Sequence, residues 1–185
     1  MELSTLWFQE RPGPAVLLEQ PGSPVQTVII DYVVDRKWFA EALAERGWGS
    51  PAPNIDWGWN GNYSPFGTGD QQQQLERADA LVPETQTKFG IDRAGLLFCS
   101  QCGDEYCGVF SARVVERDAI VSWIEFKSSW FEFFPEGDGW QGDGVWNHDA
   151  PVAEVQFHFD ARQYREAIAH LKRLIGTMRP WPGRS

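Results

Sequence analysis

The chain has 185 residues, 42% of them hydrophobic and 23% charged, which is enough for one domain with a sizeable core and excludes wholesale disorder. Its formal charge of −10 argues against a nucleic-acid binder, because such proteins need basic surfaces to neutralise phosphates. There is no run of about 18 apolar residues and no basic stretch leading into an apolar N-terminal core, so we expect no membrane span, no secretory signal and a cytoplasmic location.

Charge is unevenly distributed along the chain. Residues 160–185 carry six Lys or Arg against Asp160 and Glu166, a local charge of +4, so residues 1–159 carry −14. An acidic body can attract a basic partner, because opposite charges raise the rate of encounter. The alternative, that the acidic residues only maintain solubility, stays open.

Short strands open the chain. Leu3 to Gln9 and Ala15 to Gln20 flank the turn-forming cluster Glu10 to Pro14, which predicts a hairpin or two short edge strands. Val25 to Val34 is rich in β-branched residues and predicts the main strand of the N-terminal half.

A helix, a long loop and a second helix follow. Asp35 is the expected N-cap of a helix over residues 35–46, whose apolar stripe consists of Trp38, Phe39, Ala42 and Leu43. Residues 47–69 show no periodicity and carry five aromatic residues; the loop is either functional or closes the edge of the core with its rings. Residues 71–82 predict a short helix whose inward side chains are Leu75, Ala78 and Val82.

An antiparallel meander dominates the second half of the chain. Strands are expected at residues 95–101, 107–116 and 119–127, with a turn at Glu116 to Asp118. Because residues i and i+2 share a face of a strand, each strand has a defined buried side. Phe110, Ala112 and Val114 share one face, and in the next strand Ile120, Ile124 and Phe126 alternate with Val121, Trp123 and Glu125.

A second loop, a strand and the most regular helix complete the chain. Residues 135–151 form a glycine-rich loop with four carboxylates, two tryptophans and no Lys or Arg. Residues 152–159 return to strand alternation, and Asp160 begins a helix over residues 160–177 with Gln163 at the capping-box position. The apolar stripe of that helix is Tyr164, Ala167, Ile168, Leu171, Leu174 and Ile175.

The three cysteines lie within nine residues. Cys99 and Cys102 have the C-x2-C spacing that forms half of many zinc sites, and Cys107 with Asp104 or His148 could complete the ligand set. A small zinc-binding protein or enzyme that uses this cluster is therefore the alternative function. We favour cysteines that pack beside a tight turn, because no second ligand pair occurs, and we expect no metal or cofactor.

Catalytic motifs are missing from the sequence. There is no G-x-S-x-G, no G-x-G-x-x-G after a strand and no phosphate loop. Of the three histidines, His158 is expected on the solvent or partner side of its strand and His170 beside the apolar stripe of its helix. We therefore expect the protein not to be an enzyme.

Residues 95–171 carry three short motifs. They read Cys102-Gly-Asp-Glu-Tyr-Cys107, Trp123-Ile-Glu-Phe126 and Phe159-Asp-Ala-Arg-Gln-Tyr164. In these motifs the chain resembles a group of uncharacterised bacterial proteins, common in actinobacteria. The motifs are of structural type, so the resemblance implies an order of elements and no activity.

These patterns predict a single α+β domain over residues 1–185, with a mostly antiparallel sheet and two main helices packed on one face. One sheet is expected to contain residues 25–34 together with the strands of the second half. The predicted function is protein binding, most concretely as an intracellular immunity protein that neutralises a basic bacterial toxin domain. A self-associating domain anchored by Trp57 and Trp59 is a further alternative. The expected partner contacts are Trp57, Trp59, Asp138, Trp140, Asp143 and Trp146.

Overall fold

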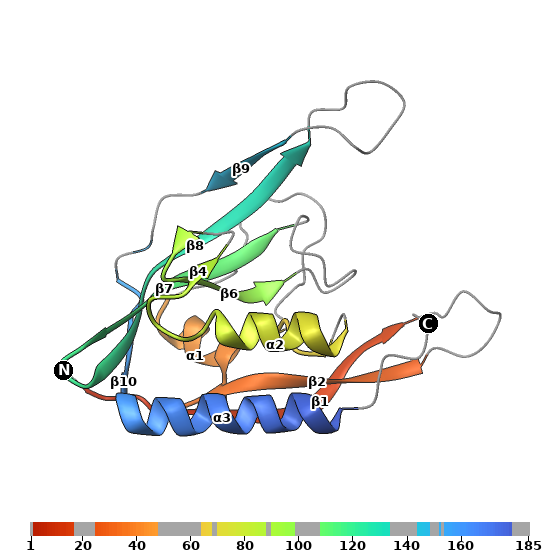
Figure 1. Ribbon diagram of the computed structural model, residues 1–185, viewed down its shortest axis with the longest axis horizontal. Helices are drawn as coiled ribbons and strands as arrows, with labels where there is room; N and C mark the ends of the chain where they lie inside the picture. The colour runs from red at the N-terminus through yellow and green to blue at the C-terminus, as the bar shows by residue number, and fades with distance from the viewer. Residues whose placement is uncertain are drawn as a thin grey trace.

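The fold is α+β, as the sequence predicts (Figure 1). The computed structural model describes residues 2–16, 25–47, 64–67, 70–87, 90–98, 108–133, 144–148, 152 and 154–178. Within these ranges, antiparallel strands form a three-stranded sheet, a five-stranded sheet and a two-stranded ribbon, accompanied by three helices.

The first sheet has the strand order β1-β2-β3, with β1 at Leu6–Val16, β2 at Val25–Val34 and β3 at Lys37–Trp38. β2 confirms the predicted main strand. The predicted turn at residues 10–14 is wrong: β1 continues through it, and its register with β2 shifts between Pro12 and Ala15. An edge strand can accommodate prolines at such an irregularity, because fewer of its N–H groups are needed for pairing.

The connection between β2 and β3 is a two-residue turn. Asp35 and Arg36 have φ values of +52° and +67°, the left-handed conformation that two-residue hairpin turns require. Asp35 is therefore not a helix N-cap, and that prediction is wrong. Helix α1 spans Phe39–Glu45, and the Glu41 carboxylate accepts a hydrogen bond from the Trp38 N–H at 3.2 Å.

The second sheet has the strand order β10-β8-β7-β6, and β9 pairs with the far part of β8. This sheet confirms the predicted meander, with strand boundaries shifted by a few residues. The prediction of one shared sheet is wrong, because β2 belongs to the first sheet. The strands are β6 (Arg93–Phe98), β7 (Val109–Arg117), β8 (Ile120–Phe133), β9 (Gly144–His148) and β10 (Phe157–Asp160). The ribbon consists of β4 (Gln86–Thr87) and β5 (Gly90–Ile91).

Helices α2 (Gln71–Asp79) and α3 (Ala161–Thr177) confirm the two other predicted helices. Asp160 caps α3 as predicted, because its carboxylate accepts the N–H groups of Arg162 and Gln163 at 3.0 and 2.9 Å. The capping box at Gln163 is wrong: its side-chain amide instead exchanges hydrogen bonds with the backbone of Leu6. This contact fastens α3 to the first sheet, along which it runs (Figure 1).

One hydrophobic core joins both sheets and all three helices. At its centre the Trp123 ring lies 5.6 Å from Tyr32, 5.5 Å from Phe39 and 5.1 Å from Phe159, between ring centroids. All three are edge-to-face contacts, a favourable arrangement for aromatic pairs. Most aromatic side chains of the described segments are thus buried in the core.

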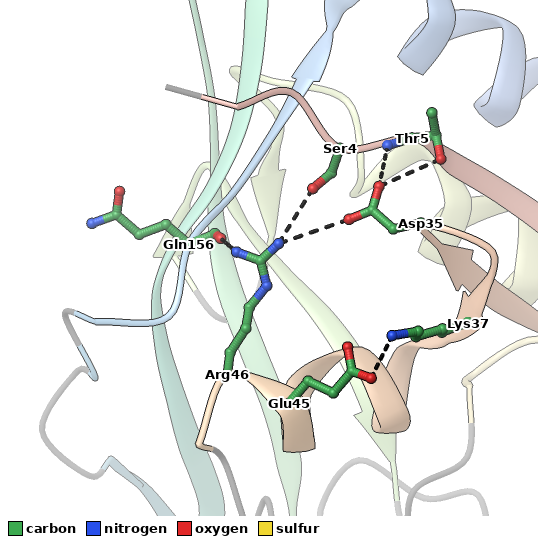
Figure 2. Close-up of polar contacts among 7 residues, drawn as sticks. All are labelled: Ser4, Thr5, Asp35, Lys37, Glu45, Arg46 and Gln156. Atoms are coloured by element: carbon green, nitrogen blue, oxygen red, sulfur yellow. Dashed lines mark hydrogen bonds and ion pairs between the residues drawn. The ribbon is translucent and has the colours of Figure 1, made fainter.

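The seam between the two sheets is held by backbone and side-chain bonds. Ser4 N–H donates to the His158 carbonyl at 2.6 Å, so the start of the chain lies beside β10. Arg46, just past α1, donates to the Gln156 carbonyl at 2.7 Å and lies 3.8 Å from the Asp35 carboxylate (Figure 2). Asp35 in turn accepts the Thr5 N–H at 2.8 Å.

Candidate binding surface

Most of the predicted contact residues lie outside the described ranges. These are Trp57, Trp59, Asp138, Trp140 and Asp143, and the three cysteines Cys99, Cys102 and Cys107 lie outside them too. The structure therefore brings none of these side chains together in a describable site, and their roles stay predictions.

Trp146 is the one predicted contact residue on a described strand. It lies in β9, directly opposite Phe131 of β8 in the antiparallel register. β7 pairs with β8 only as far as Ser129, so among the described strands the end of β8 has β9 as its partner. This β8–β9 arm extends away from the rest of the fold (Figure 1). Trp146 therefore stands on a projecting ribbon, a position suited to contact with another molecule.

A groove of about 700 Å³ lies between α3, the β7–β8 turn and the segment after α2. No pattern in the sequence predicts it. Its charged lining residues are three cations, Arg117, Arg165 and Lys172, and three carboxylates, Glu84, Glu116 and Asp118. The other lining residues are Val82, Pro83, Ala119, Val121, Tyr164, Ile168 and Ala169. The volume falls in the range of small-molecule and side-chain pockets.

The floor of the groove is apolar and rigid. Tyr164 on α3 is fully buried there; its hydroxyl donates to the Leu81 carbonyl at 2.8 Å and accepts from the Trp123 indole N–H at 3.0 Å. Burial raises the pKa of Tyr164 well above its ordinary value, although the Trp123 hydrogen bond opposes the change. The phenol therefore stays protonated and holds the floor in place. Val82 at the rim is 41% exposed, so the prediction that it points inward is wrong.

Ion pairs neutralise part of the groove wall. The Nη2 atom of Arg165 donates to both carboxylate oxygens of Glu116, at 2.5 and 2.7 Å, in charge-assisted contacts. Lys172 pairs with Asp79 at 2.5 Å. Both pairs tie α3 to neighbouring elements, and their charges largely cancel.

Two rim carboxylates have no such partner. Neither Glu84 nor Asp118 forms an ion pair with another residue in the described ranges. Both have positive φ values, +66° and +51°, and the neighbouring Ala119 has +61°. Residues other than glycine rarely adopt this conformation, so both turns form at some conformational cost, and both carry an exposed carboxylate.

The predicted positions of His158, on the outer side of its strand, and of His170, beside the apolar stripe of its helix, are confirmed. His158 is half-buried on the sheet face away from the core, and its Nδ1 lies 2.8 Å from the Ser122 hydroxyl. His170 stacks on Trp7 of β1 at 4.3 Å between ring centroids. Among the residues that the structure describes, no group of three or more His, Cys, Asp or Glu is arranged to hold a metal ion.

No protein-family model, curated protein or solved structure matches the chain. The resemblance of residues 95–171 to uncharacterised bacterial proteins stays a prediction. In the described part of the chain, every helix is too short or too polar to cross a bilayer.

Proposed function

We propose that the protein is a non-enzymatic protein-binding module, an immunity protein of the bacterial cytoplasm that neutralises a basic toxin domain. The observation that carries this proposal is the groove, where an apolar floor lies beside the carboxylates of Glu84 and Asp118 in a chain of net charge −10. The acidic, Trp-rich loops that the sequence singles out belong to the same proposal.

The groove suits a Lys or Arg side chain of the partner. Such a side chain has an aliphatic stem and a charged head, so the stem can cover the apolar floor around Val121 and Ile168. The head then meets Glu84 and Asp118 at the rim. The acidic charge of the whole chain adds long-range attraction, which raises the association rate and makes it sensitive to salt.

The test uses the purified protein and the product of the neighbouring gene. We expect the two to co-elute in gel filtration and the toxic activity to be lost in the complex. The double variant Glu84→Lys/Asp118→Lys should slow association by roughly tenfold or more at low salt, because it reverses the rim charge. Glu154→Lys/Glu166→Lys is the matched control: it makes the same change of net charge at two exposed residues that do not line the groove.

Three outcomes would count against the proposal. Absence of co-elution and of inhibition contradicts the function itself, whereas equal effects of the groove variant and of Glu154→Lys/Glu166→Lys contradict the role of the groove. Stoichiometric zinc in protein purified without added metal, lost in Cys102→Ser, would instead support the zinc-binding alternative.

A further inference from the structure

Two arginines lie directly opposite each other on the outer face of the second sheet. Arg93 on β6 is the register partner of Arg113 on β7. Like charges in this position destabilise a sheet, because the side chains of directly paired residues are neighbours. The Arg93 side chain is also only 8% exposed, so its charge is largely removed from water. Such a pair requires an anion beside it.

The anion in this structure is the side chain of Glu125. Its carboxylate lies 3.5 Å from Arg93 and 3.4 Å from Arg113, and the Arg93 guanidinium also donates to the Glu125 carbonyl at 3.0 Å and the Ser111 hydroxyl at 3.2 Å. Charge-assisted hydrogen bonds are usually about 2.7–2.9 Å long. The Glu125 carboxylate is therefore shared between two cations and held loosely by both.

The backbone aims Glu125 at this position. The β7–β8 register shifts between Ser111 and Arg113, so Glu125 and Phe126 together face the single residue Ala112. Glu125 has a φ of +52° at this bulge, a costly conformation for a glutamate. The Glu125 side chain is nevertheless 44% exposed, so it can leave the arginines by moving into water.

Lys127 adds a third cation to the cluster. It is the register partner of Ser111, whose hydroxyl binds Arg93, and no ion pair of Lys127 is formed with a described residue. Burial lowers the pKa of Lys127, and the nearby charge of Arg93 lowers it further. Among described residues the cluster thus holds three cations and one carboxylate, a local charge of +2 in a chain of −10.

We propose that Arg93, Arg113 and Lys127 form a binding site for a small divalent oxyanion, such as the phosphate group of a small molecule, which displaces the side chain of Glu125. When the side chain of Glu125 leaves, the three cations carry +3, and a doubly charged ligand compensates two of these charges where Glu125 compensates only one. Arg113 supplies the planar fork that suits phosphate oxygens, Lys127 supplies a compact charge, and Arg93 is held in place by Ser111. This site lies on another face from the groove and does not depend on the protein-binding proposal.

The experiment is a titration of the protein with inorganic phosphate at constant ionic strength, followed by the amide and arginine side-chain signals in NMR spectra. We expect saturable shifts confined to β6, β7 and β8, the same with sulfate and none with chloride. Arg113→Gln should weaken phosphate binding by about tenfold or more, because it removes a charge-assisted hydrogen bond. Lys127→Gln should weaken it as well, and covers the case that Arg113→Gln fails to fold.

Glu125→Gln separates a binding site from a purely structural ion pair. Removal of the competing carboxylate should tighten phosphate binding, whereas the arginine and lysine variants loosen it. Arg173→Gln is the control, since it removes an exposed cation of α3 far along the chain from the cluster. Shifts that chloride reproduces, or a Glu125→Gln variant that binds phosphate no tighter than the wild type, would overturn the proposal.

Discussion

Asp31 shows how a single residue can set the pH dependence of the fold. Its side chain on β2 is 3% exposed and forms an ion pair with Arg11, and the Tyr32 N–H donates to it at 2.8 Å. Burial raises the pKa of Asp31 from 3.8 to about 6, although the Arg11 charge and the Tyr32 hydrogen bond oppose this. Desolvation outweighs the ion pair because the carboxylate is almost entirely removed from water.

A carboxyl whose pKa is raised by folding stabilises the protein at low pH. The contribution of Asp31 is complete below its unfolded pKa of 3.8 and is lost as the pH rises through about 6. Between these values the wild type should lose on the order of 1–3 kcal/mol of unfolding free energy relative to Asp31→Asn. Urea unfolding of both proteins over this pH range checks the prediction, and parallel stability curves would contradict it.

The positive φ values of several residues other than glycine could not be predicted from the sequence. Asp35, Arg36, Asp118, Ala119 and Glu125 all have them, and none carries the glycine signal that announces such a conformation. Strict alternation places Trp123 and Glu125 on one face of β8. The bulge at Glu125 changes the phase, so that Trp123 and Phe126 both lie in the core.

Among the elements, α3 contacts both sheets and helix α2. Its Tyr164 hydroxyl joins Trp123 of β8 to the carbonyl of Leu81 after α2. Both partners are buried, so neither can exchange this bond for one with water. A buried polar group left without its partner costs more than the net value of the bond it loses.

We therefore expect Tyr164→Phe to destabilise the protein by about 1–3 kcal/mol, because it leaves the Trp123 N–H and the Leu81 carbonyl unpaired. Tyr32→Phe is the matched control. The Tyr32 hydroxyl is buried without a hydrogen-bond partner in the described structure, so its removal should be neutral or stabilising. Chemical denaturation of both variants measures the difference. Equal destabilisation by the two changes would show that ring packing, and not the hydroxyl, dominates at Tyr164.

Periodicity predicted the elements better than their partners. The strands β2, β7 and β8 and the helices α2 and α3 follow from spacings of two and of three to four residues in the sequence. The membership of β2 in a separate sheet, with its chain neighbours β1 and β3, did not follow, because periodicity identifies a strand but does not say which residues it will lie beside. The groove was missed for the same reason, since it combines residues near 83, 118 and 168. Of the predicted contact residues, Trp146 alone can be placed on an element.

On the scale of the whole molecule, two sheets share one core. Residues from β1, β2, β7, β8 and β10 belong to a single buried cluster together with those of all three helices. Neither sheet has a hydrophobic layer of its own that could persist when the other is lost. A shared core of this kind favours unfolding as one cooperative unit.

We expect tryptophan fluorescence and far-ultraviolet circular dichroism to report the same urea transition. Trp123 reports the environment where the sheets meet, and circular dichroism reports all of the secondary structure. Separate midpoints would indicate that one sheet unfolds before the other and would contradict the cooperative unit. The Trp123→Phe variant identifies the share of the fluorescence change that comes from this position.

The contact of Ser4 with β10 has a consequence for synthesis. β1 forms its seam with residues 158 and 163, so more than 150 residues separate these partners in the chain, as in the bond between Leu6 and Gln163. A ribosome synthesises β1 long before α3, the helix that packs against it. The apolar face of the hairpin formed by β1 and β2 therefore stays uncovered in the nascent chain until α3 has left the exit tunnel.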